Sequence, residues 1–334
     1  MQVSVLDDRE SAPVAIGEHL RSDALRAALR IQQALLDGAR TTLRSAGFVE
    51  LLPPVIGPVT DPGGRGSKQA DVDYYGNRYK LMSSAILYKQ AMLTTFDKIF
   101  YVAPNVRLEP LETTSTKRHL CEFHQLDVEI AGAGHEEAMA VAEGVVTSAI
   151  EVVLRDCADE LALLGRDVAA LMPAACGGFE RRTHDSVVSA ARAAGHTQDA
   201  AAEIAWSVEE KISAAADRPF FVTGYPKGSR GFYDMEDPGN PGTLMNFDLL
   251  AGEGYGEICS GSRREHEYVN VVTRMRESGE NPAKYKWYLD MVRSGIPASA
   301  GFGIGLERMT RWVGGLGAVW QATAFPKLAG VVAP

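Results

Sequence analysis

Two stretches of alternating side chains between positions 101 and 130 predict a β-hairpin with two unlike faces. The apolar positions share one face: Val102, Val106, Leu108, Leu126, Val128 and Ile130. The positions between them are mostly polar or charged: Asn105, Arg107, Glu109, Phe123, Gln125, Asp127 and Glu129. If the strands pair, one face packs on the core and the other suits a charged, planar ligand such as a nucleotide. Taken alone, such alternation is also typical of a solvated sheet face.

A helical pattern precedes the hairpin and another follows it. Apolar residues recur at helical spacing from Leu25 to Leu43, with Ser22 placed to cap the helix and Gly47 placed to end it. Residues 48–52 then read as a strand that two prolines terminate. The alanine-rich range 151–216 contains further helical patterns without evident chemistry, so we expect a small helical insertion there.

The charge balance argues against a nucleic-acid partner. The chain has 34 Lys and Arg against 43 Asp and Glu, a net charge of -9. Affinity for nucleic acid depends largely on Lys and Arg that neutralise phosphates, and no cluster of such residues stands out. We therefore expect no nucleic acid among the partners.

Length and composition predict one large domain and no membrane segment. The 334 residues, 46% of them hydrophobic, suffice for a sizeable core. No apolar stretch approaches the length of a membrane span and residues 1–10 are largely polar, which predicts a cytoplasmic protein. The 4 cysteines are isolated from one another, so neither a zinc site nor a disulfide framework is predicted.

The hairpin residues also carry a family resemblance. The runs VRLE at 106–109, RHLCEF at 118–123 and DVE at 127–129 resemble the second signature motif of class II aminoacyl-tRNA synthetases, in the aspartate and asparagine branch. The run GFGIGLER at 301–308 resembles the third motif of that family. A GxGxG run alone is more typical of a tight turn or close packing than of a ligand site, but the order of the motifs makes chance a poor explanation.

The resemblance implies an α+β fold, an antiparallel β-sheet flanked by helices. Residues 22–334 would form the catalytic domain and residues 1–21 an N-terminal arm. The first helix and strand resemble the motif that builds the family's dimer interface, so a homodimer is expected. Synthetases of this branch carry an N-terminal oligonucleotide-binding barrel, for which residues 1–21 are too short. Binding and charging of tRNA are therefore not expected.

The resemblance further implies an ATP site in which Arg107 and Arg308 are the catalytic residues. Arg107 would contact the α-phosphate, Glu109 would accept from the adenine amino group, and Phe123 would stack on the purine. The full ATP-binding set is Arg107, Glu109, Arg118, His119, Leu120, Phe123, Glu257, Gly305 and Arg308. Magnesium, which prefers hard oxygen ligands, would be held by Asp248, Glu257 and Ser260.

The resemblance assigns the amino-acid pocket to Ser84, Lys89, Gln125, Asp127 and Arg264. Gln125 and Asp127 would hold the ammonium group, and Arg264 would grip the side chain together with Lys89. A pocket with two cations favours a second carboxylate, because a neutral amide leaves one cation uncompensated. Aspartate is therefore the expected substrate rather than asparagine.

Two departures from the tRNA-charging pattern shape the functional expectation. Ile86 replaces a glutamine that anchors the amino group, and the run ASA at 298–300 replaces a proline, histidine and glycine. Among family members without the barrel, the chain most resembles the archaeal-type asparagine synthetases. We therefore expect an AMP-forming ligase that uses ATP and Mg²⁺ to form an aspartyl adenylate and transfers it to ammonia. The alternatives are a ligase that uses another amine or carrier, and a non-catalytic synthetase paralogue. The sequence leaves open which carboxylate is activated and which nucleophile accepts it.

Overall fold

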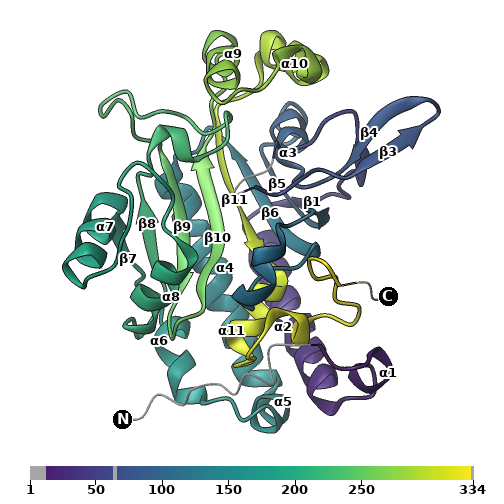
Figure 1. Ribbon diagram of the computed structural model, residues 1–334, viewed down its shortest axis with the longest axis vertical. Coiled ribbons are helices and arrows are strands. Elements are labelled where there is room, and N and C mark those ends of the chain that lie inside the picture. The colour runs from purple at the N-terminus through teal and green to yellow at the C-terminus, as the bar shows by residue number, and fades with distance from the viewer. Residues whose placement is uncertain (1–12, 63–65, 332–334) are drawn as a thin grey trace.

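The centre of the molecule is an eight-stranded sheet in the order β1-β5-β6-β11-β10-β9-β8-β7 (Figure 1). The computed structural model describes residues 13–62 and 66–331. The strands span Val49–Glu50 (β1), Lys98–Val106 (β5), Glu122–Ala131 (β6), Ser299–Gly305 (β11), Gly256–Arg263 (β10), Asn246–Ala251 (β9), Phe220–Thr223 (β8) and Glu180–Thr183 (β7). The pairs from β5 to β8 are antiparallel, whereas β1 with β5 and β7 with β8 are parallel. The expected α+β fold with an antiparallel sheet is confirmed, with a parallel pair added at each edge.

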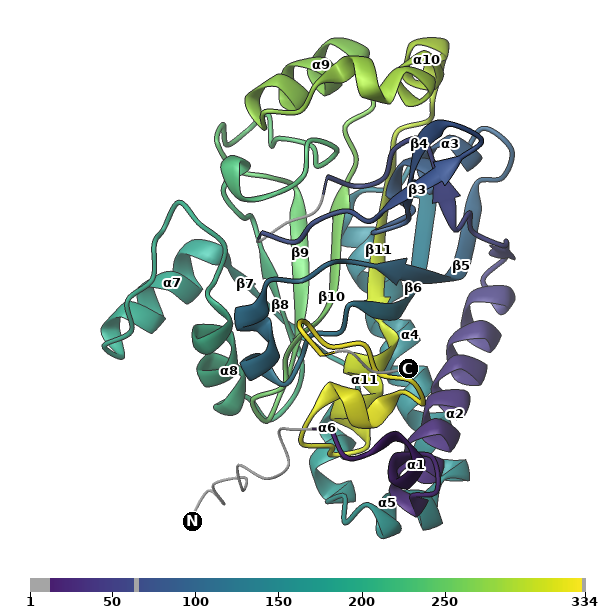
Figure 2. The same ribbon diagram turned by 45° about the vertical axis from the view of Figure 1, so that its right-hand side comes forward.

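Long helices cover one face of this sheet (Figure 2). The helices span Ile16–His19 (α1), Asp23–Ser45 (α2), Ile86–Met92 (α3), His135–Asp156 (α4), Ala158–Leu163 (α5), Met172–Ala175 (α6), His184–Ala193 (α7), Trp206–Ala214 (α8), Tyr268–Glu277 (α9), Lys286–Gly295 (α10) and Leu306–Val313 (α11). Helices α2, α4 and α11 pack on the sheet in one apolar core that includes Ile31, Val128, Val145 and Trp312. A separate apolar cluster joins α3, α9 and α10. The face of the sheet opposite the long helices is left for the polar side chains.

The ends of α2 follow the sequence pattern. The Ser22 side chain accepts a hydrogen bond from the Leu25 amide, 3.4 Å away, and so satisfies a free donor of the first turn. After the helix Gly47 has a φ of 84°, the left-handed region that glycine adopts without strain. The predicted hairpin is also present, since β5 and β6 pair from Lys98 with Ile130 to Val106 with Glu122.

The helical range differs from the expected 151–216 at its start. Residues 151–156 are the last part of α4, whose buried side chains Ile150 and Val153 belong to the main core. Residues 180–183 add β7 to the main sheet. Helix α8 begins at Trp206. The Gln198 side chain holds the loop before it through the Glu203 carbonyl and the Ala205 amide, both 2.9 Å away.

The remaining strands form a small sheet in the order β2-β4-β3, spanning Ile56–Gly57, Asn77–Leu81 and Asp71–Tyr74. Within the described residues, none of the helices combines the length and apolar character that a membrane crossing requires. The first part of the N-terminal arm, residues 1–12, lies outside the described residues. The cytoplasmic location stays a prediction.

The homodimer also stays a prediction, and apolar side chains after α2 offer a test. Leu52, at the end of the segment expected to form the interface, is 98% exposed, and Val55 just beyond that segment is 54% exposed. Because burial of such side chains on a second copy removes apolar surface from water, we expect a dimer in sedimentation equilibrium at micromolar concentration. Leu52→Glu should shift the protein toward monomer without unfolding the subunit. A monomeric wild type would contradict the prediction.

Candidate active site

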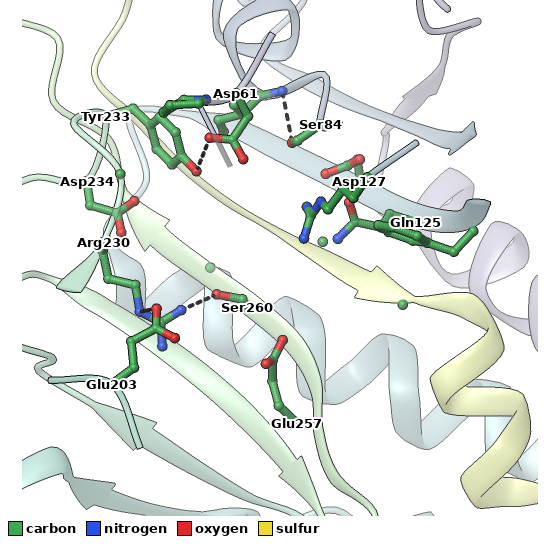
Figure 3. A pocket seen from close by; sticks show the side chains of 18 of the residues that line it. Asp61, Ser84, Gln125, Asp127, Glu203, Arg230, Tyr233, Asp234, Glu257 and Ser260 are labelled. Carbon is green, nitrogen blue, oxygen red and sulfur yellow. Dashed lines mark hydrogen bonds and ion pairs between the residues drawn. The ribbon is translucent and has the colours of Figure 1, made fainter. Parts of the chain in front are cut away.

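One cavity of about 500 Å³ opens on the polar face of the sheet. Among its lining residues are nearly all those singled out from the sequence: Ser84, Lys89, Arg107, Glu109, Arg118, His119, Leu120, Phe123, Gln125, Asp127, Glu257, Ser260, Arg264, Gly305 and Arg308. Asp248 is the exception, since it lies on β9 behind the lining and is 1% exposed. Figure 3 shows side chains that point into this space from different elements, among them the carboxylates of Asp127 and Glu257 and the guanidinium of Arg230. The individual roles assigned to these residues stay predictions.

Two arginines from distant parts of the chain face the same cavity. The Arg107 guanidinium lies 5.1 Å from the centre of the Phe123 ring, and its Nε donates to the Ser83 carbonyl, 3.0 Å away. Arg308 donates to the carbonyls of Arg118 and Glu257, at 3.2 and 3.3 Å, and forms an ion pair with the Glu257 carboxylate. Burial lowers the pKa of Arg308 below its ordinary value. This arrangement places one arginine beside an aromatic ring and a second arginine in the same cavity, which suits a nucleotide.

Arg118, a loop residue of the predicted ATP-binding set, is held by the helical insertion. Arg118 is 5% exposed, and its Nη1 donates to Glu209 of α8 at 2.6 Å. The ring of His119 lies 4.5 Å from that of Trp206, at the start of the same helix. Sequence reasoning missed Trp206 and Glu209. Their spacing of three positions fits any amphipathic helix, so no local signal identifies them.

The two cations of the predicted amino-acid pocket, at what we call the amino-acid end of the cavity, are already paired with carboxylates of the protein. Lys89 is 2% exposed, and its ammonium donates to Asp127 at 2.8 Å and lies 3.5 Å from Glu129. Arg264 donates through Nε and Nη2 to the two carboxylate oxygens of Glu129, at 3.0 and 3.1 Å. Because carboxylates of the protein compensate both charges, the argument that an uncompensated cation selects aspartate does not hold.

Glycine in β11 makes the pairing of Glu129 with Arg264 possible. A Cβ on Gly301 would lie 2.1 Å from the Glu129 carboxylate and 2.2 Å from the Val128 carbonyl. A side chain at this position would push Glu129 away from Arg264. This glycine of the GxGxG run therefore permits close packing around the site.

Two further acids reach the amino-acid end, and sequence reasoning missed both. Asp234 accepts a hydrogen bond from Ser262 and lies 3.7 Å from Arg264. Its burial raises the pKa of its carboxyl group. Asp61 accepts from the Tyr233 hydroxyl at 3.1 Å (Figure 3). Both acids lie in irregular segments, where no periodic pattern marks a residue as facing a site.

The residues predicted to hold magnesium face an arginine that the sequence analysis did not consider. Arg230 donates to the two Asp248 carboxylate oxygens, at 3.2 and 2.5 Å, and to the Ser260 hydroxyl at 3.3 Å. Burial raises the pKa of Asp248 to about 6. Among the residues that the structure describes, no group of three or more His, Cys, Asp or Glu is placed to hold a metal ion. As arranged here, Asp248 and Ser260 do not offer a metal ion free oxygen atoms.

Comparisons with known proteins agree on one family. The family model for tRNA synthetases class II (D, K and N) matches residues 18–329. The asparagine–tRNA ligase of Thermococcus kodakarensis is 34% identical over 309 residues, which are 92% of this chain and 70% of that protein. That of Lactobacillus delbrueckii subsp. bulgaricus is 32% identical over 338 residues, covering 98% of this chain and 77% of that protein.

A solved structure resembles the whole described fold. The asparaginyl-tRNA synthetase from Pyrococcus horikoshii, complexed with asparaginyl-adenylate, superposes with a TM-score of 0.90 at 31% identity. The match covers 96% of this chain and 72% of that one. The crystallised relative thus holds an amino-acid adenylate on the same fold.

Proposed function

Because the chain belongs to the class II tRNA synthetases of the D, K and N group, we propose that it activates asparagine with ATP and transfers it to tRNA. The reaction would be that of an AMP-forming ligase. The relatives that bear on it are asparagine–tRNA ligases, which this chain matches over most of its length.

Two expectations from the sequence were wrong. The relatives at 32–34% identity are tRNA ligases, which contradicts the ammonia-dependent aspartate ligase and does not favour its alternatives. They also contradict the expectation that tRNA is no partner. Net charge failed as a guide because it sums over the whole surface, whereas phosphates contact local groups. The ligase class itself agrees with the relatives.

The proposal that asparagine is the substrate rests on a hydrogen-bond donor, Arg264, that lies next to an acceptor, Asp234, at the amino-acid end of the cavity. Arg264 and Asp234 both line it, with the nearest atoms of the pair 3.7 Å apart. A carboxamide has one accepting oxygen and one donating nitrogen, so asparagine can accept from Arg264 and donate to Asp234. Aspartate in the same pose would place a second carboxylate against Asp234, without a hydrogen to share.

The backbone groups of asparagine have partners in the same cavity. Asp127 Oδ2 is buried and has no hydrogen-bond partner among the described residues, so it suits the substrate ammonium. Asn105 donates to Gln125 Oε1 at 2.7 Å, which leaves Gln125 an amide N–H to present to the substrate carboxylate. We therefore propose that Asp127 would hold the ammonium and that Gln125 would orient the carboxylate. The prediction from the sequence that both hold the ammonium is untested.

The charges also fit the two chemical steps. A carboxylate oxygen attacks the α-phosphorus of ATP, a new P–O bond forms, and the bond to pyrophosphate breaks. Arg107 and Arg308 would stabilise the negative charge that develops on the phosphates. A ribose hydroxyl of tRNA then loses its proton and attacks the carbonyl carbon of the adenylate, and AMP leaves. The predicted magnesium ion stays a prediction.

Asparagine-dependent exchange of pyrophosphate into ATP tests this function directly. We expect exchange with asparagine to exceed that with aspartate by about 100-fold or more, because a site built on hydrogen bonds rejects an analogue that leaves them unmade. Transfer to tRNA is then measured as acid-precipitable asparagine. Equal or faster exchange with aspartate would overturn the choice of substrate.

The Asp234→Asn variant is the matched control for this experiment. It keeps the size of the side chain and removes the anion that opposes aspartate, so the preference for asparagine should fall by about 10-fold or more. Asp199→Asn makes the same chemical change on an exposed loop of the insertion and should leave the preference unchanged.

A further inference from the structure

Arg230 fills the position beside Asp248 and Ser260 where a cation was expected. Its Nη2 donates to Asp248 Oδ2 at 2.5 Å, and its Nη1 donates to Asp248 Oδ1 at 3.2 Å and to Ser260 at 3.3 Å. Figure 3 shows its guanidinium between Ser260 and Glu203, whose carboxylate lies 3.0 Å from Nε. The guanidinium thus occupies the space between oxygen atoms of both carboxylates.

The surroundings of Arg230 hold it firmly in this position. The guanidinium lies 4.1 Å from the centre of the fully buried Tyr225 ring, and the arginine side chain is 13% exposed. The loop that carries it is tied to α9, because Arg274 donates to the carbonyls of Lys227 and Gly231, each 3.2 Å away. An arginine that stacks on an aromatic ring and pairs with two carboxylates has a fixed position in the site.

Displacing this guanidinium would leave two acids facing each other, one of them buried. Asp248 is 1% exposed, and the Glu203 side chain is 20% exposed. Breaking a buried ion pair by removing one partner leaves an uncompensated charge, which is strongly unfavourable. A magnesium ion would also require oxygen ligands that are free to approach closely, and Asp248 already accepts through both of its oxygens.

We propose that Arg230 is a resident cation of this site, which takes the place of a divalent metal ion at Asp248 and Ser260. It neutralises Asp248 whether or not a nucleotide is bound. Of the three predicted metal ligands, Glu257 is the carboxylate that lines the cavity. A metal ion that enters with a nucleotide therefore meets Glu257 and not Asp248. This inference rests on the charges of the chain itself and is independent of which amino acid the enzyme activates.

A titration of the full chain with Mn²⁺ in the absence of nucleotide tests the proposal. The electron paramagnetic resonance signal of free Mn²⁺ measures how much of the ion is bound. We expect no wild-type site that depends on Asp248. Arg230→Ala should gain one bound Mn²⁺ per chain, because the vacated space is lined by Asp248, Glu203 and Ser260. Arg230→Ala combined with Asp248→Asn should lose that ion again.

The matched control is Arg276→Ala, which removes an exposed arginine of α9 and should bind no more Mn²⁺ than the wild type. Failure of Arg230→Ala to gain an ion, or a wild-type site that Asp248→Asn abolishes, would overturn the proposal. If Arg230→Ala does not fold, Mn²⁺ binding is compared between the wild type and Asp248→Asn in the presence of a non-hydrolysable ATP analogue. Equal numbers of bound Mn²⁺ per chain support the proposal that Arg230 takes the place of the metal ion. Fewer bound ions in Asp248→Asn than in the wild type refute that proposal. None of these readouts depends on asparagine activation, so the proposed function is tested separately.

Discussion

Arg107→Ala is expected to lower the rate of asparagine-dependent pyrophosphate exchange by about 10²–10³-fold or more. The guanidinium lines the cavity over Phe123, where it would meet charge that develops at the α-phosphorus. Loss of such a positioned donor acts mainly on the transition state, so the turnover rate should fall more than the affinity for asparagine. Exchange kinetics at varied ATP and asparagine concentrations separate the two effects.

Two further variants make this result specific to Arg107. Arg107→Lys keeps one positive charge but not the planar fork of donors, so most of the loss should remain. Arg276→Ala removes an exposed arginine and should keep wild-type exchange. The melting temperature of Arg107→Ala should change little, because the side chain is half-buried and, among the described residues, its hydrogen bond is to the Ser83 carbonyl. Exchange within a few-fold of wild type would refute the role of Arg107.

Arg264→Ala is expected to abolish asparagine-dependent exchange and to lower the free energy of unfolding by about 3 kcal/mol. Removal of the arginine takes away the donor for the substrate carboxamide and leaves Glu129 as a buried carboxylate without its bidentate partner. The loss of stability should lie toward the lower end of the range typical for a broken buried ion pair, because Glu129 keeps two other partners. Lys89 lies 3.5 Å from the Glu129 carboxylate, and the Ser299 hydroxyl donates to that carboxylate at 2.9 Å. Urea denaturation measures the stability, and pyrophosphate exchange measures the activity.

A double variant separates the two consequences. Arg264→Met combined with Glu129→Gln removes both charges and roughly keeps the volumes, so much of the stability should return while exchange stays absent. Recovery of exchange in the double variant would show that Arg264 serves the fold and does not hold the substrate. Unchanged stability in Arg264→Ala would show that the Glu129 pair contributes little to folding.

The sequence predicted the parts of the molecule that neighbouring residues encode. The alternation from 101 to 130 placed Leu126, Val128 and Ile130 in the core and Gln125 and Asp127 on the cavity face, because side chains of a strand alternate between its faces. The cap at Ser22 and the turn at Gly47 bounded α2 for equally local reasons. The order of the motifs also indicated the family and collected most of the cavity lining.

Only the tertiary structure decided how the charges of the site are paired. Arg264 and Glu129 are 135 positions apart, Arg118 and Glu209 are 91 apart, and Arg230 and Asp248 meet across 18. Such pairs obey no sequence period, because they form when separate strands and loops assemble around a cavity. For that reason the sequence predicted that Lys89 and Arg264 would bind a carboxylate of the substrate. In the folded chain Asp127 and Glu129 already neutralise these two cations. The sequence identified which charged residues belong to the site. The net charge that the cavity presents to a ligand depends on how the fold pairs those residues.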